Sequence, residues 1–382
     1  MSMKLISNQE RERLATIKAF LKSENLSLRS LVKIKGDASF RTYYRIKNSD
    51  LILMDADPKT NEKISSFIKV QKILSQYGVR VPEIYKKNVS SGLMIIEDLG
   101  MKRFLDYSDD SKFLLLLYRE CGQELGSIHN QSILKPSEIK NLKKYTLNEQ
   151  MKETELFFDW YLEKHLNKTI LDSDRKKFRK IFRNIYKKLN IKNYCLVLRD
   201  FHVDNIIPTQ VPQKYDGKTP ISSKYFNLGI IDFQDALVGS PAYDLSSLIE
   251  DVRAPINEEM KKKIIFIYKV ATKGFIKNNS SKIGKPDPQW HKFIPQYEDE
   301  DLYYKLKNIA EDTFNDFETK VSYFSIQRNL KILGIFCRLK YRDKKTTYIK
   351  YLPQAKKFVR DNLKNPQFEE LKNWFIENKI NV

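Results

Sequence analysis

The chain has 382 residues, 41% of them hydrophobic and 12% aromatic, and a formal net charge of +21. It is long enough for a large core and for two lobes, and its composition excludes intrinsic disorder. The first residues lack the apolar core of a secretory signal, and the longest apolar runs, such as 113–118, are far below the roughly 20 residues of a membrane span. Three widely spaced cysteines exclude a disulfide framework and a zinc site. We therefore expect a cytoplasmic protein.

The positive charge permits two interpretations. It is compatible with binding to nucleic acid or to an anionic membrane surface. However, the lysines are spread along the whole chain, without a basic block, an RGG tract or an RNP-like aromatic motif. The pattern favours a solvated, lysine-rich surface that suits a negatively charged nucleotide or substrate, and we expect neither a nucleic-acid nor a membrane partner. Polyanion binding stays open as the alternative.

The first hundred residues combine predicted strands with two predicted helices. Apolar residues at helical spacing predict a helix within 8–30 and an amphipathic helix at 62–74. Alternating apolar residues between turn signals predict five strands, at 31–35, 39–46, 51–57, 81–85 and 93–99.

After Gly100 the pattern becomes mainly helical, with two turn-rich stretches. We read 209–226 as a hairpin loop or insertion and 280–300 as a second long loop. The order of elements predicts an α+β chain with a small lobe over 1–100 and a larger, mainly helical lobe over 101–382. Ligands often bind in a cleft between two such lobes. Helices are predicted at 111–130, 147–166, 172–190, 257–279, 301–318 and 322–340.

Two short motifs place carboxylates at the ends of apolar runs in the helical lobe. The first is LRDFHVDN at 198–205, and the second is IIDFQD at 230–235. Asp200 and Asn205 share one short loop, and Asp232 on a neighbouring strand can face them. Asn and Asp oxygens suit Mg²⁺, while a remaining carboxylate can accept the proton of an attacking hydroxyl. This division of labour is typical of phosphoryl transfer.

The spacing of the first motif matches the catalytic loop HRDxxxxN of protein kinases, with Leu198 in the position of the His. Asp232 then stands where kinases have the aspartate of DFG. On this mapping Asp200 is the base, and Asn205 and Asp232 hold Mg²⁺. The triplet alone is a weak signal because polar residues are common at strand ends. The ordered pair of motifs, downstream of a strand-rich lobe, strongly favours a phosphotransferase.

Three longer segments carry a more specific signal than the triplet: GDASFRTYYR at 36–45, IIDFQDALVGSPAYDL at 230–245 and QRNLKILGIFCRLKYRD at 327–343. They resemble one branch of the kinase fold, the aminoglycoside-phosphotransferase and choline-kinase-like family. Within it, the chain is most similar to bacterial kinases of cell-wall amino sugars. The resemblance implies a two-lobed, protein-kinase-like fold, ATP and Mg²⁺ as cofactors, and phosphorylation of the anomeric hydroxyl of N-acetylmuramate or N-acetylglucosamine.

The resemblance also implies a nucleotide site in the small lobe. Met54 stands where kinases usually have a strand lysine, so Arg41 and, less strongly, Arg45 are candidates for the phosphate counter-charge. The turn at 36–39 is an ordinary hairpin or a phosphate cradle. The backbone after the last strand is expected to meet the adenine. The residues assigned to nucleotide binding are Ser39, Phe40, Arg41, Glu97 and Leu99.

Acceptor contacts are expected from the helical lobe. An aromatic plane beside a carboxylate can hold a pyranose ring, although the same residues suit a helix core. Arginines on the last predicted helix can bind a carboxylate in a bidentate manner, or lie solvated. Asp244 is expected to brace the catalytic loop, and His129 to be structural. The acceptor candidates are Asp235, His202, Arg199, Glu155, Trp160, Tyr161 and Arg328.

Two rival functions stay open at this point. The first is a kinase of another small-molecule hydroxyl, such as choline, a different sugar or an aminoglycoside. The second is a non-catalytic, basic protein that binds nucleic acid or a membrane surface on a kinase scaffold, which the missing strand lysine favours. The three motif residues argue against the second. We expect a small-molecule partner and a monomer or weak dimer.

Overall fold

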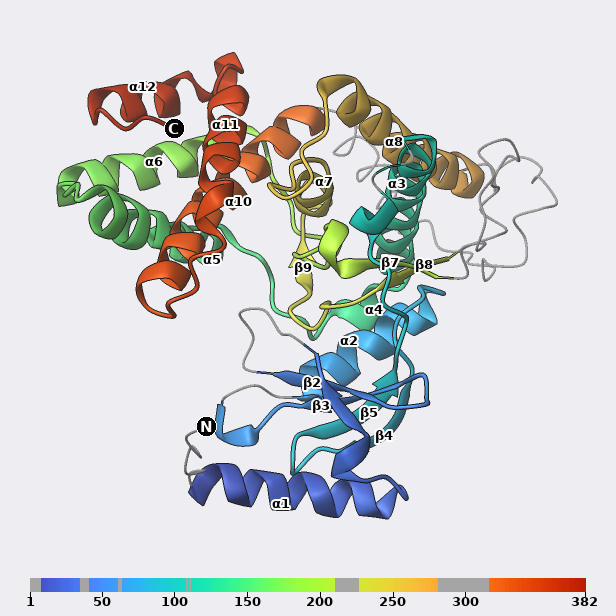
Figure 1. The fold of residues 1–382 in the computed structure, drawn as a ribbon. Coiled ribbons are helices and arrows are strands. Elements are labelled where there is room, and N and C mark those ends of the chain that lie inside the picture. The colour runs from blue at the N-terminus through green and yellow to red at the C-terminus, as the bar shows by residue number, and fades with distance from the viewer. Residues whose placement is uncertain are drawn as a thin grey trace. The chain divides into compact units, whose positions relative to one another are not determined.

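The computed structural model describes residues 8–34, 41–60, 64–107, 109, 111–209, 227–280 and 316–382. The chain divides into two compact units (Figure 1). The strand unit is Met1–Arg103 with Ile206–Asp235, and the helical unit is Phe104–Asn205 with Ala236–Val382. The second motif, at 230–235, thus belongs to the strand unit, whereas the sequence assigned everything after residue 100 to one lobe. Each unit is described by itself.

The strand unit is built on a five-stranded antiparallel sheet in the order β1-β2-β3-β5-β4. This confirms the predicted five strands. The fourth begins only after Pro82, since proline cannot donate a ladder hydrogen bond, and it continues through exposed lysines that carry no apolar signal. The strands are β1 (Leu31–Lys33), β2 (Thr42–Ile46), β3 (Leu51–Asp55), β4 (Ile84–Asn88) and β5 (Leu93–Glu97).

Helices cover both faces of this sheet, α1 (Asn8–Ser23) on one and α2 (Ile64–Gln76) on the other (Figure 1). Ile17 and Leu21 of α1 pack against Leu53 and Ile95, which are cross-strand partners. Because side chains alternate along a strand, Met54 faces away from α1, and it is fully buried.

Helix α1 is shorter than the predicted 8–30 because the chain reverses after it. Asn25 adopts a φ of 58°, and the N–H of Leu26 donates to the carbonyl of Leu21 at 2.8 Å. A left-handed residue at this place is a common helix end.

The strand unit also holds a hairpin of β7 (Ile206–Thr209) and β8 (Asn227–Ile230), with Thr209 opposite Asn227. These two strands follow the first motif and lead into the second. The predicted hairpin connection is confirmed by their antiparallel pairing. Most of the turn-rich stretch 209–226 lies outside the described residues.

Long helices form the helical unit, and glycines let two pairs of them approach closely. A Cβ on Gly126 of α3 (Ser111–Leu134) would lie 2.8 Å from Ala271 of α8 (Glu258–Ser280). A Cβ on Gly334 of α10 (Phe317–Tyr341) would lie 2.2 Å from the carbonyl carbon of Leu156. At that point α5 (Leu147–Leu156) changes into a π-helix, Phe157–His165. The helices predicted at 111–130, 147–166, 257–279 and 322–340 are thereby confirmed.

A pair of short strands, β6 (Cys195–Val197) and β9 (Leu237–Gly239), precedes the first motif and follows the second. After β9 comes α7 (Ala242–Ile249), all of whose residues are buried. The predicted helix at 172–190 is confirmed as α6 (Asp172–Lys188), and a single turn, α4 (Pro136–Ile139), follows α3. The loop 280–300 and most of the helix predicted at 301–318 lie outside the described residues. None of the described helices has the length and apolarity of a membrane span.

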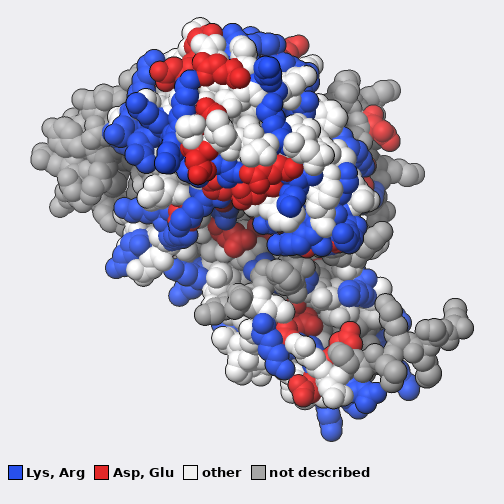
Figure 2. Space-filling model, turned by 90° about the vertical axis from the view of Figure 1, so that its left-hand side faces the viewer, with Lys and Arg blue, Asp and Glu red and all other residues white. Residues whose placement is uncertain are grey.

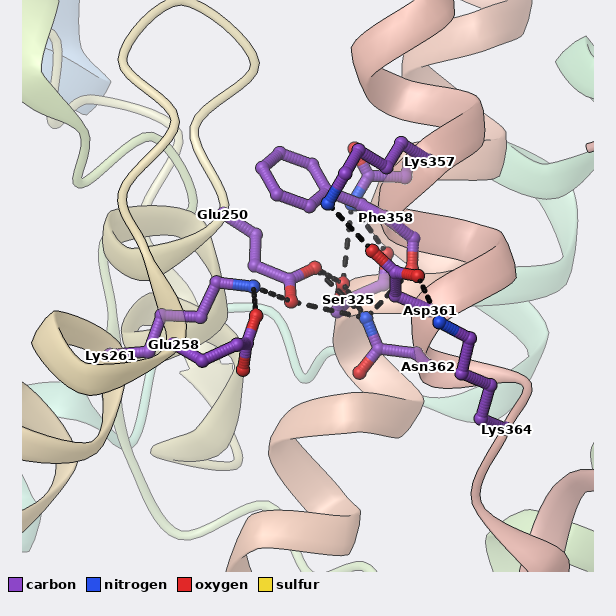
Figure 3. A network of polar contacts seen from close by, with 10 residues as sticks. Glu250, Glu258, Lys261, Ser325, Lys357, Phe358, Asp361, Asn362 and Lys364 are labelled. Carbon is purple, nitrogen blue, oxygen red and sulfur yellow. Dashed lines mark hydrogen bonds and ion pairs between the residues drawn. The ribbon is translucent and has the colours of Figure 1, made fainter.

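Two C-terminal helices, α11 (Leu352–Asn362) and α12 (Glu369–Glu377), were not predicted. Trp374 of α12 is fully buried against Phe178 of α6, with ring centroids 4.8 Å apart. Helix α11 is held by the Glu250 network, which we define as Glu250, Lys261, Ser325 and Asn362 (Figure 3). In it, the carboxylate of Glu250 accepts from Lys261 at 3.0 Å, from Asn362 at 3.0 and 3.1 Å, and from Ser325.

Candidate active site

The catalytic loop, residues 198–205, leaves β6 at its C-terminal end and closes in a 3-10 turn, Val203–Asn205. Its first two amides are bound by Asp244 in the first turn of α7. The N–H of Leu198 donates to Oδ2 at 2.6 Å, and the N–H of Arg199 donates to Oδ1 at 2.8 Å. Asp244 is completely buried. The prediction that Asp244 braces this loop is confirmed.

His129 lies behind Asp244. Its Nδ1 is 2.9 Å from the hydroxyl of Tyr268, and its Nε2 is 3.7 Å from Oδ2 of Asp244. The ring is 1% exposed. This arrangement supports the structural role expected for His129.

Arg199 holds the loop from the other side. Its φ of 71° is in the left-handed region, which costs a non-glycine residue about 1–3 kcal/mol. The guanidinium pairs with Glu153 of α5 and lies over the ring of Tyr145, 5.8 Å from its centroid. Burial alone would lower the pKa of Arg199, but the neighbouring acidic groups, Glu153 foremost, together outweigh it and raise that pKa. The structure thus engages Arg199 with Glu153, and its assignment as an acceptor contact stays a prediction.

Asn205 links the two ends of the loop. Its Nδ2 donates to the backbone carbonyl of Asp200 at 2.9 Å and lies 3.4 Å from Nε2 of His202. Because a carbonyl oxygen only accepts, the amide nitrogen must be the atom that faces it. This orientation leaves Oδ1 of Asn205 as a hard oxygen ligand, the kind that Mg²⁺ prefers.

Asp200 is half-buried and surrounded by positive charge. Burial alone would raise the pKa of the Asp200 carboxyl. Neighbouring positive charges outweigh this effect and hold the pKa of Asp200 below its ordinary value. The carboxylate is therefore ionised at neutral pH and can accept a hydrogen bond from a hydroxyl. The permanently charged groups that lower its pKa are Lys331, Arg199 and Arg328, in decreasing order.

Glu153 is the centre of this charge arrangement, and the sequence analysis missed it. Its carboxylate accepts from Arg199, from the hydroxyl of Tyr145, and from Lys331 of α10 at 3.2 Å. Burial alone would raise the pKa of Glu153, but Lys331 and Arg199 outweigh it and lower that pKa. Nothing in the sequence distinguishes Glu153 from a solvated helix charge. Lys331, however, lies within the family-like segment 327–343.

A second group missed from the sequence is Asp251, which follows α7 and is completely buried. Its Oδ1 accepts from the N–H of Arg253 at 3.0 Å and from Nη1 of Arg253 at 3.3 Å. Arg253 also pairs with Asp204 of the catalytic loop, with Nε 2.8 Å from Oδ2. Arg253 therefore ties the segment after α7 to the loop.

In the strand unit, the second motif follows β8. Asp232 is exposed, adopts a φ of 58°, and accepts from Nε2 of Gln234 at 2.7 Å. Phe233 turns into the core against Phe67, with centroids 4.8 Å apart. Gln234 is buried as well and begins a turn at 234–235. Asp235, an acceptor candidate, is exposed at the end of this turn.

The nucleotide-binding candidates have mixed outcomes. Ser39 and Phe40 lie outside the described residues, and Arg41 is buried just before β2. The guanidinium of Arg45, by contrast, binds Asp98 at 2.5 Å and the carbonyl of Gly100 at 3.1 Å. Arg45 therefore braces the end of the strand unit, which argues against a phosphate contact.

The structure also reduces the number of backbone groups that could make the expected adenine contact. The N–H of Glu97 donates to the carbonyl of Glu83 at 2.9 Å, and its carboxylate pairs with Arg80 at 2.6 Å. Glu97 thus uses its amide within the sheet, so that group cannot donate to a base. Leu99, two residues later, is 9% exposed.

Two of the three sugar-contact candidates on α5 and its π-helical extension contact other side chains of the helical unit. Glu155 is bound by Arg179 at 2.7 Å and lies 3.5 Å from Arg175, both on α6. Tyr161 is buried and stacks on Phe157 at 5.5 Å, while Trp160 is half-buried. The burial of Tyr161 favours the alternative of a helix core, and sugar contact by these three residues stays a prediction.

The three arginines of α10 differ in their surroundings. Arg342 is exposed and pairs with Asp343 at 2.8 Å, and Arg338 is half-buried. Arg328 is 4% exposed, and its charge acts on Asp200. Of the three, Arg328 is the one that belongs to the surroundings of the catalytic loop.

The positive net charge is not gathered into one patch on the visible face of the helical unit. Figure 2 shows Lys and Arg side chains there, interleaved with a group of Asp and Glu side chains. Such mixing also occurs in single ion-pair clusters, since Arg175 pairs with Asp159 at 3.1 Å and also with Glu163. This face offers acidic and basic groups together.

Comparison with known proteins identifies relatives over most of the chain. The N-acetylmuramate/N-acetylglucosamine kinase of Pseudomonas aeruginosa is 24% identical over 347 residues, which cover 89% of this chain and 86% of the relative. The kinase of the same name from Neisseria meningitidis is 26% identical over 332 residues, which cover 85% and 83%.

Solved structures show the same fold at low identity. The choline kinase LicA from Streptococcus pneumoniae has a TM-score of 0.53 at 12% identity and covers 93% of this chain and 100% of its own. The gentamicin complex of APH(2")-IIa has a TM-score of 0.54 at 14% identity, covering 96% and 99%. These neighbours confirm the predicted protein-kinase-like fold.

The match to a family model covers both motifs. Residues 30–273 match the phosphotransferase enzyme family, which includes the catalytic loop, Asp232 and Asp244. The protein is accordingly a kinase with a hydroxyl acceptor. The chain belongs to the phosphotransferase enzyme family.

Proposed function

We propose that this protein is an ATP- and Mg²⁺-dependent kinase that transfers the γ-phosphoryl group to the anomeric hydroxyl of N-acetylmuramate and N-acetylglucosamine. Two relatives that carry these sugars in their names match it over 89% and 85% of the chain. The observation that carries the proposal is Asp200: a half-buried carboxylate, on a loop fixed at both ends, whose lowered pKa keeps it ionised.

Asp200 would act as the group that orients the acceptor. Its ionised carboxylate accepts a hydrogen bond from the sugar hydroxyl and aims the oxygen at the phosphorus. Because its pKa is low, Asp200 is a poor base toward a free hydroxyl. The proton therefore moves to it late, as the new P–O bond forms and the hydroxyl becomes acidic. This order suits the loose transition state of phosphoryl transfer.

Asn205 and Asp232 would hold the metal. Asn205 offers Oδ1, because its amide nitrogen is engaged with the carbonyl of Asp200. Asp232 offers a carboxylate in the position that follows β8. Such hard oxygen atoms suit Mg²⁺, which when bound neutralises charge on the phosphates. The order of the two motifs in the chain supports this assignment.

The phosphate counter-charge has to come from a residue other than the strand lysine, because Met54 is buried in the core of the strand unit. Arg41, directly before β2, is our candidate for this role. Ser39 and Phe40 precede it in the family-like segment and stay assigned to the nucleotide, as does the backbone at Leu99.

The test is ADP release by the purified protein with Mg²⁺-ATP and a panel of acceptors. The panel holds N-acetylmuramate, N-acetylglucosamine, glucose, galactose, choline and kanamycin. We expect release with the two N-acetylated sugars alone. Release with choline or kanamycin only would refute the proposed substrate but keep the chemistry. Binding of RNA or lipid vesicles, without turnover of any acceptor, would support the non-catalytic alternative instead.

A further inference from the structure

Arg328, on α10, carries a buried polar group that nothing described in the chain satisfies. Its side chain is 4% exposed, and Nη1 has no hydrogen-bond partner within the described residues. A guanidinium offers five donors in a planar fork and stays charged. Leaving a buried charged donor unpaired costs more free energy than leaving a neutral one. The position therefore suits a ligand that brings an acceptor atom.

Contacts of its neighbours on α10 place Arg328 beside the catalytic loop, because Gln327 and Lys331 both bind Glu153, the partner of Arg199. The charge of Arg328 also lowers the pKa of Asp200 and the pKa of Asp251. Asp251 is already engaged through Oδ1, which accepts twice from Arg253. That engagement reduces the repulsion that Asp251 would exert on an incoming anion. The other cations of the site are engaged too, since Arg199 and Lys331 both bind Glu153.

His202 supplies a second unpartnered donor in the same place. Since Nδ2 of Asn205 donates, Nε2 of His202 is the accepting nitrogen. A neutral ring that accepts at Nε2 carries its proton on Nδ1. That Nδ1 is buried and has no partner within the described residues.

We propose that Arg328, assisted by His202, binds the carboxylate of an acidic amino-sugar acceptor. Through this contact, Arg328 is the residue that selects N-acetylmuramate over N-acetylglucosamine. The inference rests on the proposed function. A carboxylate fits because it presents two oxygens to the fork of one guanidinium and satisfies a buried positive charge, which a hydroxyl does only in part. N-acetylmuramate carries such a carboxylate on its lactyl group, and N-acetylglucosamine has none.

The test compares the two sugars in Arg328→Gln and Arg328→Lys, with Arg342→Gln as the matched control on the same helix. We expect Arg328→Gln to lower kcat/KM for N-acetylmuramate by about 100-fold, the loss typical of breaking a buried charged pair. Its kcat/KM for N-acetylglucosamine should fall less than about threefold, because that sugar brings no carboxylate. Arg328→Lys keeps the charge without the fork and should lie between. Arg342→Gln should match the wild type.

Three outcomes would overturn the assignment. Equal losses on both sugars would place Arg328 at the shared part of the ring or at Asp200. A raised KM for ATP would place it at the nucleotide. Unchanged kinetics would remove it from the site. If the variants do not fold, the wild-type enzyme can still test the proposal. Its kcat/KM for N-acetylmuramate should be at least about tenfold higher than that for the methyl ester of this sugar. Equal values would refute the proposal. If the wild-type enzyme phosphorylated neither sugar, that result would instead refute the proposed function.

Discussion

Two buried charge networks meet on α10, and they differ in how completely their members are satisfied. In the Glu250 network, Ser325, Lys261 and Asn362 all bind one carboxylate, and no atom of these four side chains is buried without a partner in the described chain (Figure 3). Around the catalytic loop, single buried atoms of several charged or polar side chains have no partner. These atoms are Nε of Arg199, Nδ1 of His202, Oδ2 of Asp251 and Nη1 of Arg328.

The difference distinguishes polar groups that stabilise the fold from polar groups that are available to bind ligands. A buried polar group without a partner is expensive, so proteins keep few of them. The hydrogen bonds of the Glu250 network join the end of α7 to α8, α10 and α11. The catalytic loop instead leaves donors and acceptors for molecules that the folded chain does not contain. We therefore expect changes in the first network to affect stability, and changes near the loop to affect turnover.

The largest effect should come from Asp200→Asn. The amide keeps the size of the side chain but can neither accept the proton nor hold the hydroxyl as firmly. We expect kcat to fall by about 1,000-fold or more, with the melting temperature and ATP affinity close to those of the wild type. Asp343→Asn, two residues beyond the end of α10, serves as the control. Turnover that survives in Asp200→Asn would remove Asp200 from its role.

Glu153→Gln should affect both stability and turnover. The change leaves Arg199 and Lys331 without their shared carboxylate. Breaking a buried ion pair in this way costs about 3 kcal/mol of unfolding free energy, and a shifted loop costs about 100-fold in kcat/KM. The readouts are denaturant unfolding and initial rates.

The control for Glu153→Gln is Glu155→Gln, two residues further along the helix. Glu155 pairs only with arginines of α6 among the described residues. We expect nearly wild-type rates. A specific loss of sugar affinity in Glu155→Gln would instead show that Glu155 is an acceptor contact.

Lys261→Met should separate stability from function in the Glu250 network. It leaves the buried carboxylate of Glu250 without its cation, so the unfolding free energy should fall by about 3 kcal/mol. At a temperature where the variant is folded, kcat/KM should be unchanged. Lys357→Met, at the exposed edge of Figure 3, should change neither quantity. A loss of turnover in folded Lys261→Met would erase the distinction between the two networks.

The smallest effect we predict is a shift of pH dependence in Lys331→Met. Lys331 is the strongest of the cations that lower the pKa of Asp200. Removing it destabilises the ionised carboxylate, so the pKa of Asp200 rises. The acid limb of the kcat/KM profile should then move to higher pH, whereas it should stay in place in Lys364→Met. A shift toward lower pH, or none, would show that Lys331 does not act on Asp200.

The parts of the molecule that were predictable are those encoded by local pattern. Alternating apolar residues predicted the strands, and the spacing of Asp200, Asn205 and Asp232 predicted a phosphotransferase. The bracing by Asp244 was predictable because its place at a helix start is a feature of the family-like segment. Gly334, in the family-like segment 327–343, fits the close approach of α10 to Leu156, which no periodicity reveals.

The residues that were missed depend on contacts between distant segments. Glu153 and Asp251 look like ordinary solvated charges, because burial of a charge is decided by helices far away in the chain. Arg45 looked like a phosphate ligand until Asp98 was found beside it, 53 residues later. Helix α11 depends on Glu250, 112 residues earlier than Asn362. A pattern in a single sequence does not show which distant residues pair in the folded chain.

The central claim is tested most directly by analysing the product. The purified protein is incubated with Mg²⁺-ATP and N-acetylmuramate, and the product is identified by phosphorus and proton NMR, with Asp200→Asn in parallel. We predict a sugar 1-phosphate, recognised by coupling between phosphorus and the anomeric proton, and none from the variant. Phosphate on another hydroxyl, or equal product from both proteins, would contradict the account.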